Sequence, residues 1–298
     1  MRVRPIVKVV VLSLLWVLTI NEQSLIGFSS VQAANATKDA LTLGIFPRRN
    51  TNVTVKLFNP LAEHLTKQLG KRVIIKTSRN FSTFWKEILN GRYDIVHYNQ
   101  YHYITSRDKI GYKVIAKNEE FGEDTIAGSI LVRKDSGIKK LSDLKGKTIS
   151  FGGGSKAMQS YILPLFFLRE AGLTEQDYGS IFAKNPPNAI MSVYFRQADA
   201  AGSGDKVLDL PMVTEIIHKD ELRFLVRGEQ LPHLPWAVSP KIGRTMRLKI
   251  QDTLTSLAKT PQGQRVLNHA KLTGINRATD AEYDKHREII KSVFSRKN

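Results

Sequence analysis

Apolar and polar positions along the chain alternate in blocks whose periods predict strands followed by helices. Leu41–Phe46 is a short apolar run typical of a buried strand, and residues 53–69 carry a leucine at every fourth position from Leu57 to Leu69, which fits one face of a helix. Alternation of this kind favours an α/β fold with a mostly parallel sheet covered by helices. Further strands are expected at 72–77, 93–98, 112–116, 126–132, 148–151, 181–183 and 222–226, and further helices at 82–90 and 188–196.

The last part of the chain has a helical pattern from Pro240 to Phe294, interrupted at Pro261 and Gly274. The small residues Ala200–Asp205 (AAGSGD) are expected to form a loop. No internal repeat, low-complexity tract or linker divides the sequence. If the chain folds into two domains, we therefore expect it to cross between them through strands.

The first 36 residues have the composition of a secretory signal peptide. Three basic residues precede an apolar run at Val9–Ile20, and Ala33 and Ala36 offer small-residue cleavage sites. A membrane-spanning helix needs about 20 apolar residues, whereas Asn21 and Glu22 end this run early. We expect export to the periplasm, cleavage near Ala33 to Ala36, and no insertion into the membrane afterwards.

Cysteine and charge narrow the function classes. The chain has no cysteine, which excludes disulfides, thiolate metal sites, a cysteine nucleophile and a lipoprotein anchor. Its formal net charge is +18, and the predicted leader holds three basic residues and one acid, so the mature chain keeps +16. The basic residues are scattered without a long block, which argues against nucleic acid as a partner. The charge suits a generally basic surface or the steering of a small anion into a cleft. We expect the protein to be a monomer.

A glycine run between a predicted strand and a long helix is the most informative motif. Gly152–Gly154 permit positive φ and close approach to a ligand, and Ser155 is the expected N-cap of the helix. The amides of Gly154 to Ala157, with the Ser155 hydroxyl and Lys156, form an expected anion site, because a helix start carries partial positive charge. Gln159 is a further expected contact, since its amide both donates and accepts. An ordinary capped helix is the alternative interpretation.

Polar and aromatic residues follow two other predicted strands, where open α/β sheets place their ligands. Tyr98, Asn99 and Tyr101 come after the strand at 93–98, and we expect them to contact the ligand. A metal site through the two histidines of this segment is disfavoured, because no third ligand is in view. Arg48 follows the first strand and offers a planar fork suited to an oxyanion, or it is a solvated arginine on a loop.

Several short motifs recur along the chain in a fixed order and spacing. Together they resemble the PhnD-like phosphate, phosphite and phosphonate periplasmic binding proteins of the type II (transferrin-like) fold. The motifs are PLAEHL with LGKRV at 60–73, EILNG with Asp94 at 87–94, VRKDSGI at 132–138, LSDLKGK with Phe151 at 141–151, and SYILP at 160–164.

The resemblance implies two α/β lobes joined by two crossover strands, with the ligand clamped between them and closure by a hinge motion. Lobe 1 would comprise residues 37–125 plus 227–298, and lobe 2 residues 126–226. The resemblance also implies that Phe81 is an aromatic residue of the site. Asn188, at a helix N-terminus, is expected to face the cleft. Asp205 would suit an amine or a protonated oxyanion there, or it caps the next helix.

Two binding motifs of the family are altered in this chain. A Ser-Thr-Ser triplet of phosphonate-binding members corresponds here to Ala157, Met158 and Gln159, and a Ser-His-Asp-Ala element corresponds to residues 186–189 (PPNA). Ser155 and Lys156 lie just upstream as replacement donors. The pattern is similar to the branch that includes arsenite-responsive sensors, which are thought to use a cysteine. Because this chain has none, a thiolate–arsenite bond is excluded.

These observations predict a non-catalytic receptor for a small oxyanion: phosphate, phosphite, a phosphonate or an arsenic oxyanion. No cofactor is expected. The membrane partner would be an ABC permease or, alternatively, a sensor histidine kinase. Catalysis is disfavoured because no Ser-x-x-Lys, Gly-x-Ser-x-Gly or His-Glu-x-x-His constellation occurs. A protein that binds surfaces without a small ligand is supported by the positive charge alone.

Overall fold

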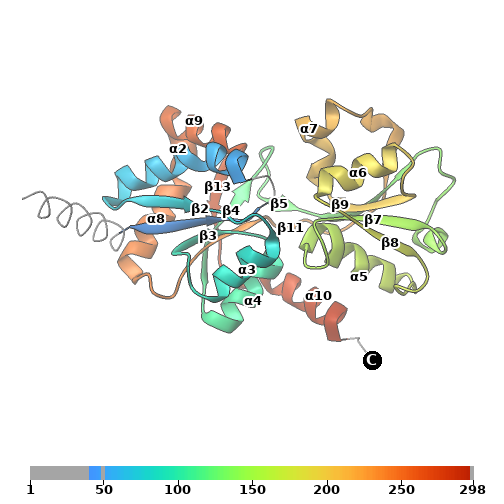
Figure 1. The fold of residues 1–298 in the computed structure, drawn as a ribbon, viewed down its shortest axis with the longest axis horizontal. Coiled ribbons are helices and arrows are strands. Elements are labelled where there is room, and N and C mark those ends of the chain that lie inside the picture. The colour runs from blue at the N-terminus through green and yellow to red at the C-terminus, as the bar shows by residue number, and fades with distance from the viewer. Residues whose placement is uncertain (1–39, 48–50, 296–298) are drawn as a thin grey trace, which may run out of the picture. The chain divides into compact units, whose positions relative to one another are not determined.

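Two main β-sheets, each covered by helices, organise the part of the chain that the structure describes (Figure 1). The computed structural model describes residues 40–47 and 51–295, so the predicted signal peptide and Arg48 lie outside the described residues. Residues from Leu41 onward form one compact unit. Within the described ranges, no helix is both long and apolar enough to cross a membrane.

The first sheet takes its strands from both the beginning and the end of the described chain. They are β1 (Leu41–Ile45), β2 (Val73–Lys76), β3 (Ile95–His97), β4 (Lys113–Glu119), β12 (Pro235–Val238) and β13 (Gly274–Arg277). Their order is β13-β4-β12-β3-β1-β2, with β1 parallel to β2 and β3, and with β12 and β13 antiparallel to their neighbours.

Helices cover the first sheet on both faces because apolar side chains alternate along its strands. Leu43 and Ile95 belong to one buried cluster, and Val96 belongs to the other. The helices are α2 (Thr51–Leu69), α8 (Arg244–Thr255) and α9 (Pro261–Ala270) on the first face, and α3 (Phe81–Leu89) and α4 (Gln100–Ile110) on the second. We call this sheet and its helices the first lobe.

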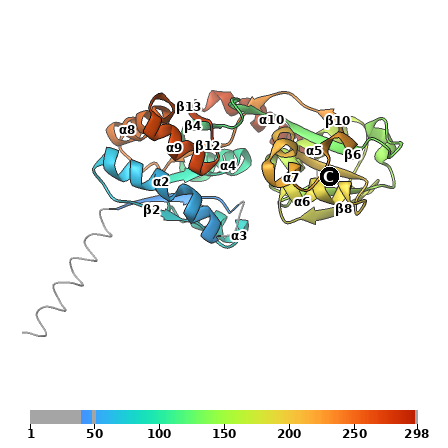
Figure 2. The same cartoon turned by 90° about the horizontal axis from the view of Figure 1, so that it is seen from above.

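The second sheet comes from the middle of the chain. Its strands are β6 (Gly128–Arg133), β7 (Thr148–Gly152), β8 (Gly179–Ala183), β9 (Ala200–Gly204) and β10 (Leu222–Arg227), in the order β10-β6-β9-β7-β8. Helices α6 (Pro186–Tyr194) and α7 (Pro211–Thr214) lie on one face, and α5 (Leu163–Glu170) lies on the other. A π-helical turn, η2 (Met158–Ile162), leads into α5. We call this sheet and its helices the second lobe; Figure 2 shows the two lobes as separate groups of elements.

Short 3₁₀ helices complete the described chain. They are Leu141–Leu144, η3 (Asp205–Asp209), Lys219–Glu221, Leu257–Lys259 and Ala281–Tyr283.

The predicted strands and helices from Leu41 to Val226 are largely found, with boundary shifts of a few residues, but the prediction of a mostly parallel sheet is wrong. Antiparallel strands complete both sheets: β12 and β13 in the first, and β6 and β10 in the second. Apolar periodicity reports how deeply a strand is buried and not its direction. Pro235–Val238, for example, is buried at all four positions.

The segment expected to be a loop, Ala200–Gly204, is instead the buried central strand β9. Its small residues are required by the close approach of η2 to the sheet. A Cβ added at Gly202 would lie 2.4 Å from the carbonyl oxygen of Ser160 and 2.8 Å from the Phe151 ring. The composition that suggests a flexible loop therefore reflects tight packing against backbone.

Two crossing segments connect the lobes at an antiparallel pair, β5 (Thr125–Ile126) with β11 (Leu231–Pro232). Buried Asp205 fastens both segments to the second lobe. Its Oδ1 accepts a hydrogen bond from the Ala127 amide at 3.0 Å, and its Oδ2 accepts one from Gln230 Nε2 at 2.8 Å. The two crossover strands are found, while the lobe boundaries at 125/126 and 226/227 stay a prediction.

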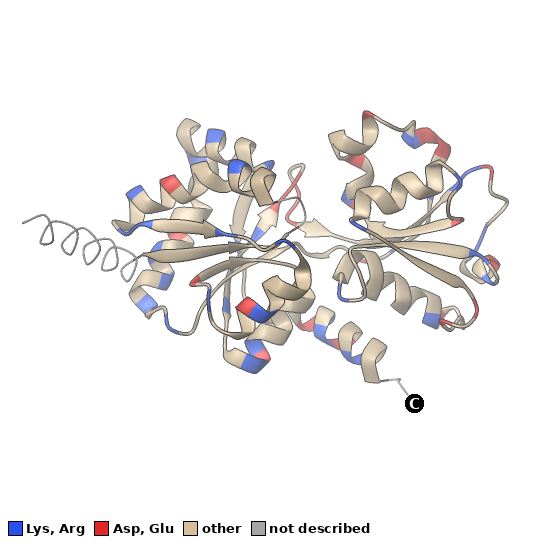
Figure 3. Cartoon of the chain, in the orientation of Figure 1, with Lys and Arg blue, Asp and Glu red and all other residues tan. Residues whose placement is uncertain are grey.

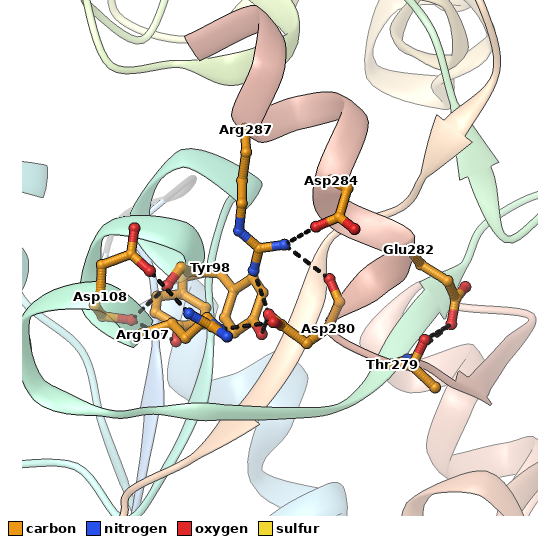
Figure 4. Close-up of polar contacts among 10 residues, drawn as sticks. Tyr98, Arg107, Asp108, Thr279, Asp280, Glu282, Asp284 and Arg287 are labelled. Atoms are coloured by element: carbon orange, nitrogen blue, oxygen red, sulfur yellow. Dashed lines mark hydrogen bonds and ion pairs between the residues drawn. The ribbon is translucent and has the colours of Figure 1, made fainter. Parts of the chain in front are cut away.

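The last helix, α10 (Asp284–Ser295), begins at a charged cluster in the first lobe (Figure 4). The Asp280 carboxylate accepts hydrogen bonds from Tyr103 Oη and Arg287 Nη2 and pairs with Arg107 Nε at 2.7 Å. Burial favours the neutral carboxyl, but these hydrogen bonds and the two guanidinium charges outweigh it and lower the pKa of Asp280. This cluster fixes the start of α10 against α4.

The other end of α10 packs against the second lobe. Ile289 and Val293 share a buried apolar cluster with Leu163 and Leu165 at the start of α5. The Arg169 guanidinium also donates to the carbonyl oxygen of Val293. Helix α10 therefore contacts both lobes, in addition to the two crossing segments.

The close packing on β9 predicts that Gly202→Ala destabilises the protein. The added methyl group would overlap the Ser160 carbonyl, and overpacking of this kind costs about 1–3 kcal/mol. Gly179→Ala on β8 is the matched control, because its nearest atom would be Thr148 Oγ1 at 3.4 Å. Urea unfolding of both variants checks this; equal stabilities would contradict the close approach.

The environment of His286 predicts a dependence of stability on pH. This α10 residue is fully buried, neither ring nitrogen has a hydrogen-bond partner among the described residues, and burial, followed by Arg287, lowers its pKa to about 3. The unfolded chain takes up a proton near pH 6.5, whereas the folded chain does not, so stability is lost as the pH falls below 6.5. As the pH falls from 7 to 5, the free energy of unfolding of His286→Leu should therefore rise by about 2 kcal/mol relative to that of the wild type.

The control for this experiment is His218→Leu, since His218 is exposed. Urea unfolding at pH 7, 6 and 5 gives the free energies of unfolding. A difference between His286→Leu and the wild type that stays constant over this range would show that His286 takes up its proton in the folded protein.

Candidate functional site

A cavity of about 340 Å³ lies between the two lobes. Its first-lobe wall comes from the end of β1 and the starts of α3 and α4, and its second-lobe wall comes from the segments that follow β7, β8 and β9. These segments lie beyond the carboxyl ends of β1, β3, β7, β8 and β9, where open α/β sheets place their ligands. The volume is within the range typical of small-molecule sites.

The second-lobe wall is built on the glycine run. Gly153 and Gly154 have φ of 89° and 93°, a region that L side chains rarely adopt, and they turn the chain sharply after β7. Gly152 must also lack a side chain, because an added Cβ would lie 2.3 Å from the Pro186 Cα. The starts of η2 and α6 therefore converge on the same end of the cavity.

The helix begins later than the sequence indicated, so the prediction of Ser155 as N-cap is wrong. The N-cap position is Ala157, which has no capping side chain, and Ser155 and Lys156 are exposed residues of the preceding turn. The Ala157 amide donates to the Gly154 carbonyl at 3.0 Å and is thereby occupied. The turn uses one of the four amides that were expected to face an anion.

Other donors of this wall have no partner in the part of the chain that the structure describes. Among the lining residues, the first-turn amides of Gln159 and Ser160 lie at the helix start, where no intrahelical acceptor exists. The Gln159 side chain is buried, and neither Oε1 nor Nε2 has a hydrogen-bond partner. An unpaired buried polar group costs about 1–3 kcal/mol. A ligand or water that forms hydrogen bonds with Gln159 would remove this cost.

The first-lobe wall is aromatic. Phe81 and Trp85 stand one turn apart on α3, and Phe46 follows β1. The Phe46 and Phe81 rings lie 6.1 Å apart edge to face, Phe81 stacks on the His102 ring at 6.4 Å, and Trp85 lies 5.1 Å from His102. The rings therefore form a contiguous apolar surface with His102 behind it.

Two buried polar residues at the start of α4 complete this wall. His102 is 4% exposed, its Nδ1 has no partner within the described ranges, and burial together with the nearby Lys156 charge lowers its pKa to about 3. The ring is therefore neutral at physiological pH. Gln100 donates from Nε2 to the Pro232 carbonyl at 3.0 Å, while its Oε1 has no partner in the described part of the chain.

Asn99 links the two walls. As N-cap of α4 it accepts a hydrogen bond from the His102 amide at 2.9 Å through Oδ1, and it donates from Nδ2 to the Lys156 carbonyl at 3.1 Å. Lys156 Nζ lies 6.0 Å from the centre of the Tyr101 ring. The turn that carries Lys156 is thereby held against the start of α4.

The charge of the cavity is positive. Lys156 and Lys184 line it, and among the described lining residues there is no carboxylate. Basic side chains are also spread over the helices of both lobes (Figure 3), as the net charge of +18 requires. The cavity therefore favours an anion over a cation.

The structure brings most of the predicted site residues together, and the following predicted residues line the cavity: Phe81, Asn99, Gly154, Ser155, Lys156, Ala157 and Gln159. Whether each of them contacts a ligand stays a prediction.

Four other predicted residues lie elsewhere. Tyr98 is fully buried beneath the site, where its hydroxyl pairs with Ser106 Oγ at 2.8 Å. Tyr101 packs behind Lys156, beside Phe294. Asn188 is exposed on α6, where its amide donates to the capping Asn185 side chain at 2.9 Å. Asp205 holds the two crossing segments through its hydrogen bonds. The remaining predicted residue, Arg48, lies outside the described residues.

Sequence reasoning missed Trp85, Gln100, His102, Lys184 and Asn185, all of which line the cavity. Trp85 stands four residues after Phe81, a spacing that places both on one helix face. Asn185 precedes two prolines, and Asn followed by Pro is a signature of a helix start. Lys184 follows β8 directly. These signals were present in the sequence, but only the strand order shows that they meet.

Comparison with known proteins shows the family. The family described as "ABC transporter, phosphonate, periplasmic substrate-binding protein" matches residues 43–283. The phosphonates-binding periplasmic protein of Escherichia coli K12 is 23% identical over 244 residues, which cover 78% of this chain and 71% of that protein.

Solved structures show the same fold. A binding protein component of an ABC phosphonate transporter from Pseudomonas aeruginosa has a TM-score of 0.73 at 14% identity, over 85% of this chain and 86% of that one. A binding protein from Prochlorococcus marinus in complex with methylphosphonate has a TM-score of 0.74 at 18% identity, over 86% and 98%. The two-lobe type II fold predicted from the sequence is confirmed, while the relation to arsenite-responsive sensors is not tested by these matches.

The match over most of the chain, together with this fold and a cavity between its lobes, leads to one conclusion: the chain belongs to the family of periplasmic substrate-binding proteins of phosphonate ABC transporters.

Proposed function

We propose that this protein captures a small phosphorus or arsenic oxyanion in the periplasm and delivers it to the membrane permease of an ABC importer. The observation that carries the proposal is the composition of the second-lobe wall. Lys156, Lys184, the first-turn amides of η2 and the unpaired Gln159 amide all lie around one cavity without a described carboxylate. Such donors suit an oxyanion, because hydrogen bonds to a charged acceptor are about twice as strong as neutral ones.

The donors differ from the hydroxyl triplet of phosphonate-binding relatives. By the resemblance described above, Ala157, Met158 and Gln159 stand where those relatives have three hydroxyl residues, and Met158 is fully buried in the apolar cluster beside α10. Gln159 therefore takes the place of a hydroxyl donor, while Lys156 and Lys184 supply the charge. This substitution keeps the class of ligand and alters the geometry of its binding.

Closure of the lobes follows from how the two walls are joined. The crossing pair β5–β11 permits a hinge motion, and we propose that the hinge lies near residues 125–126 and 226–231. Asn99 and Lys156 already link the walls through one hydrogen bond. A ligand that contacts both walls would add contacts to that link and favour the closed form. The sensor-kinase alternative stays a prediction, since no described residue distinguishes it.

The proposal predicts that oxyanions stabilise the mature protein against heat. A ligand that binds only the folded state at a hundred times its Kd adds about 2.7 kcal/mol, or roughly 5–10 °C in Tm for a chain of this length. Phosphate, phosphite, methylphosphonate and arsenate are tested by differential scanning fluorimetry, with choline chloride at equal ionic strength as the control. The proposed function fails if none of the four anions raises the Tm.

The charges of the cavity predict the effect of removing them. In Lys156→Ala/Lys184→Ala, the Kd for methylphosphonate should rise at least tenfold, which corresponds to about 1.4 kcal/mol, because an oxyanion loses two charged partners. Lys139→Ala is the matched control, since Lys139 is exposed and outside the cavity lining. Isothermal titration calorimetry gives the three values. An unchanged Kd in the double variant would place the anion elsewhere.

A further inference from the structure

The two walls of the cavity differ in chemistry in a way that a bare inorganic oxyanion does not use. The second-lobe wall carries the lysines and free amide donors, whereas the first-lobe wall presents the rings of Phe46, Phe81 and Trp85. A phosphate ion is polar on every side and would leave this aromatic surface against water. Phe46 is buried and backs this wall, while Phe81 and Trp85 are partly exposed to the cavity, and partly exposed aromatic rings on a concave wall indicate an apolar partner.

The volume supports the same conclusion. The cavity measures about 340 Å³, whereas one water needs roughly 10–15 Å³ of such space. A tetrahedral oxyanion occupies the space of a few waters, so it would fill only part of the cavity beside Lys156 and Lys184. The remainder lies toward the rings and has room for a substituent on the anion.

The groups around the rings argue against a substituent that carries an amine. Among the described lining residues there is no carboxylate to pair with an ammonium group. The carboxylate predicted from the sequence for this role, Asp205, is fully buried and accepts hydrogen bonds from Ala127 and Gln230 at the crossing segments. His102, which lies against Phe81 and Trp85, is held neutral by its burial.

We propose that the cavity is built for an organic phosphonate or related organic anion whose ring-sized apolar end packs against Phe46, Phe81 and Trp85, while its anionic end meets Lys156, Lys184 and Gln159. The proposal rests on the proposed function and names the ligand class of the same cavity. Aromatic packing beside a charged anchor makes the protein selective for an aryl substituent over a methyl group. Offset or edge-to-face ring pairs stabilise a complex beyond the effect of the area they bury.

Calorimetric titration of the mature protein with four probes tests the proposal: inorganic phosphate, methylphosphonate, 2-aminoethylphosphonate and phenylphosphonate. Phenylphosphonate should bind at least tenfold more tightly than each of the other three. If methylphosphonate or phosphate binds and phenylphosphonate is no tighter, the aryl proposal is overturned and the proposed function stands. If 2-aminoethylphosphonate is the tightest, the aryl proposal is also overturned. Failure of all four to bind would overturn the proposed function itself.

Variants at the aromatic wall locate the selectivity. Trp85→Ala should lower the ratio of phenylphosphonate to methylphosphonate affinity about tenfold, and Trp85→Phe should restore most of it. Phe195→Ala is the control, because Phe195 is 54% exposed and outside the cavity lining. If Trp85→Ala leaves this ratio unchanged, the proposal that the aryl group of the ligand packs against Trp85 is overturned.

A fluorescence readout separates a direct contact from a loss of folding. Trp85 and Trp236 are the tryptophans of the predicted mature chain, and Trp236 is fully buried in the first lobe. Phenylphosphonate should change the emission of the wild type more than methylphosphonate does at saturation, and this excess should vanish in Trp85→Phe. An equal change with both ligands would contradict a ring seated against Trp85.

Discussion

The cavity depends on two places in the second lobe where backbone meets backbone without a side chain between them. A Cβ at Gly152 would lie 2.3 Å from the Pro186 Cα, and a Cβ at Gly202 would lie 2.4 Å from the Ser160 carbonyl oxygen. Because both positions are glycine, η2 and α6 can begin directly above the sheet. The free amides of η2, the Gln159 side chain and Lys184 therefore reach one end of one cavity.

The rest of the site follows from the opposite wall, which the first lobe supplies. Strand β1 and helices α3 and α4 bring Phe46, Phe81, Trp85 and His102 together as a neutral, largely apolar surface. Asn99 joins this surface to the charged wall by capping α4 and donating to the Lys156 carbonyl. The second lobe therefore provides the charge and the amide donors, and the first lobe provides the aromatic rings.

Much of this arrangement could be predicted from the sequence, for identifiable reasons. The positive-φ glycines, Lys156 and Gln159 form a local motif, and their place beside the cavity follows from chain order alone. Trp85 and Lys184 could not be placed as surely, because their meeting depends on the order of strands in two sheets. Strands β12 and β13 were not predicted: each has only four residues, and Gly274–Arg277 lies inside the segment at 240–294 whose pattern predicts helices. The strand β9 was mistaken for a loop because small residues serve both flexible turns and tight packing. Asp205 was predicted to contact the ligand, but its carboxylate instead accepts hydrogen bonds from Ala127 and Gln230. These partners lie far from it in the sequence and could not be foreseen.

The C-terminal helix has a consequence for how such a molecule can move. Two adjacent strands by themselves form a joint that can both bend and twist. Helix α10 is rooted by Asp280 and Arg287 in the first lobe and rests its Ile289 and Val293 on α5 of the second. A relative motion of the lobes that separates α10 from α5 would expose these apolar side chains to water, which is unfavourable. Helix α10 therefore opposes relative motions of the lobes that break this contact, in addition to the restraint that the two crossing strands impose.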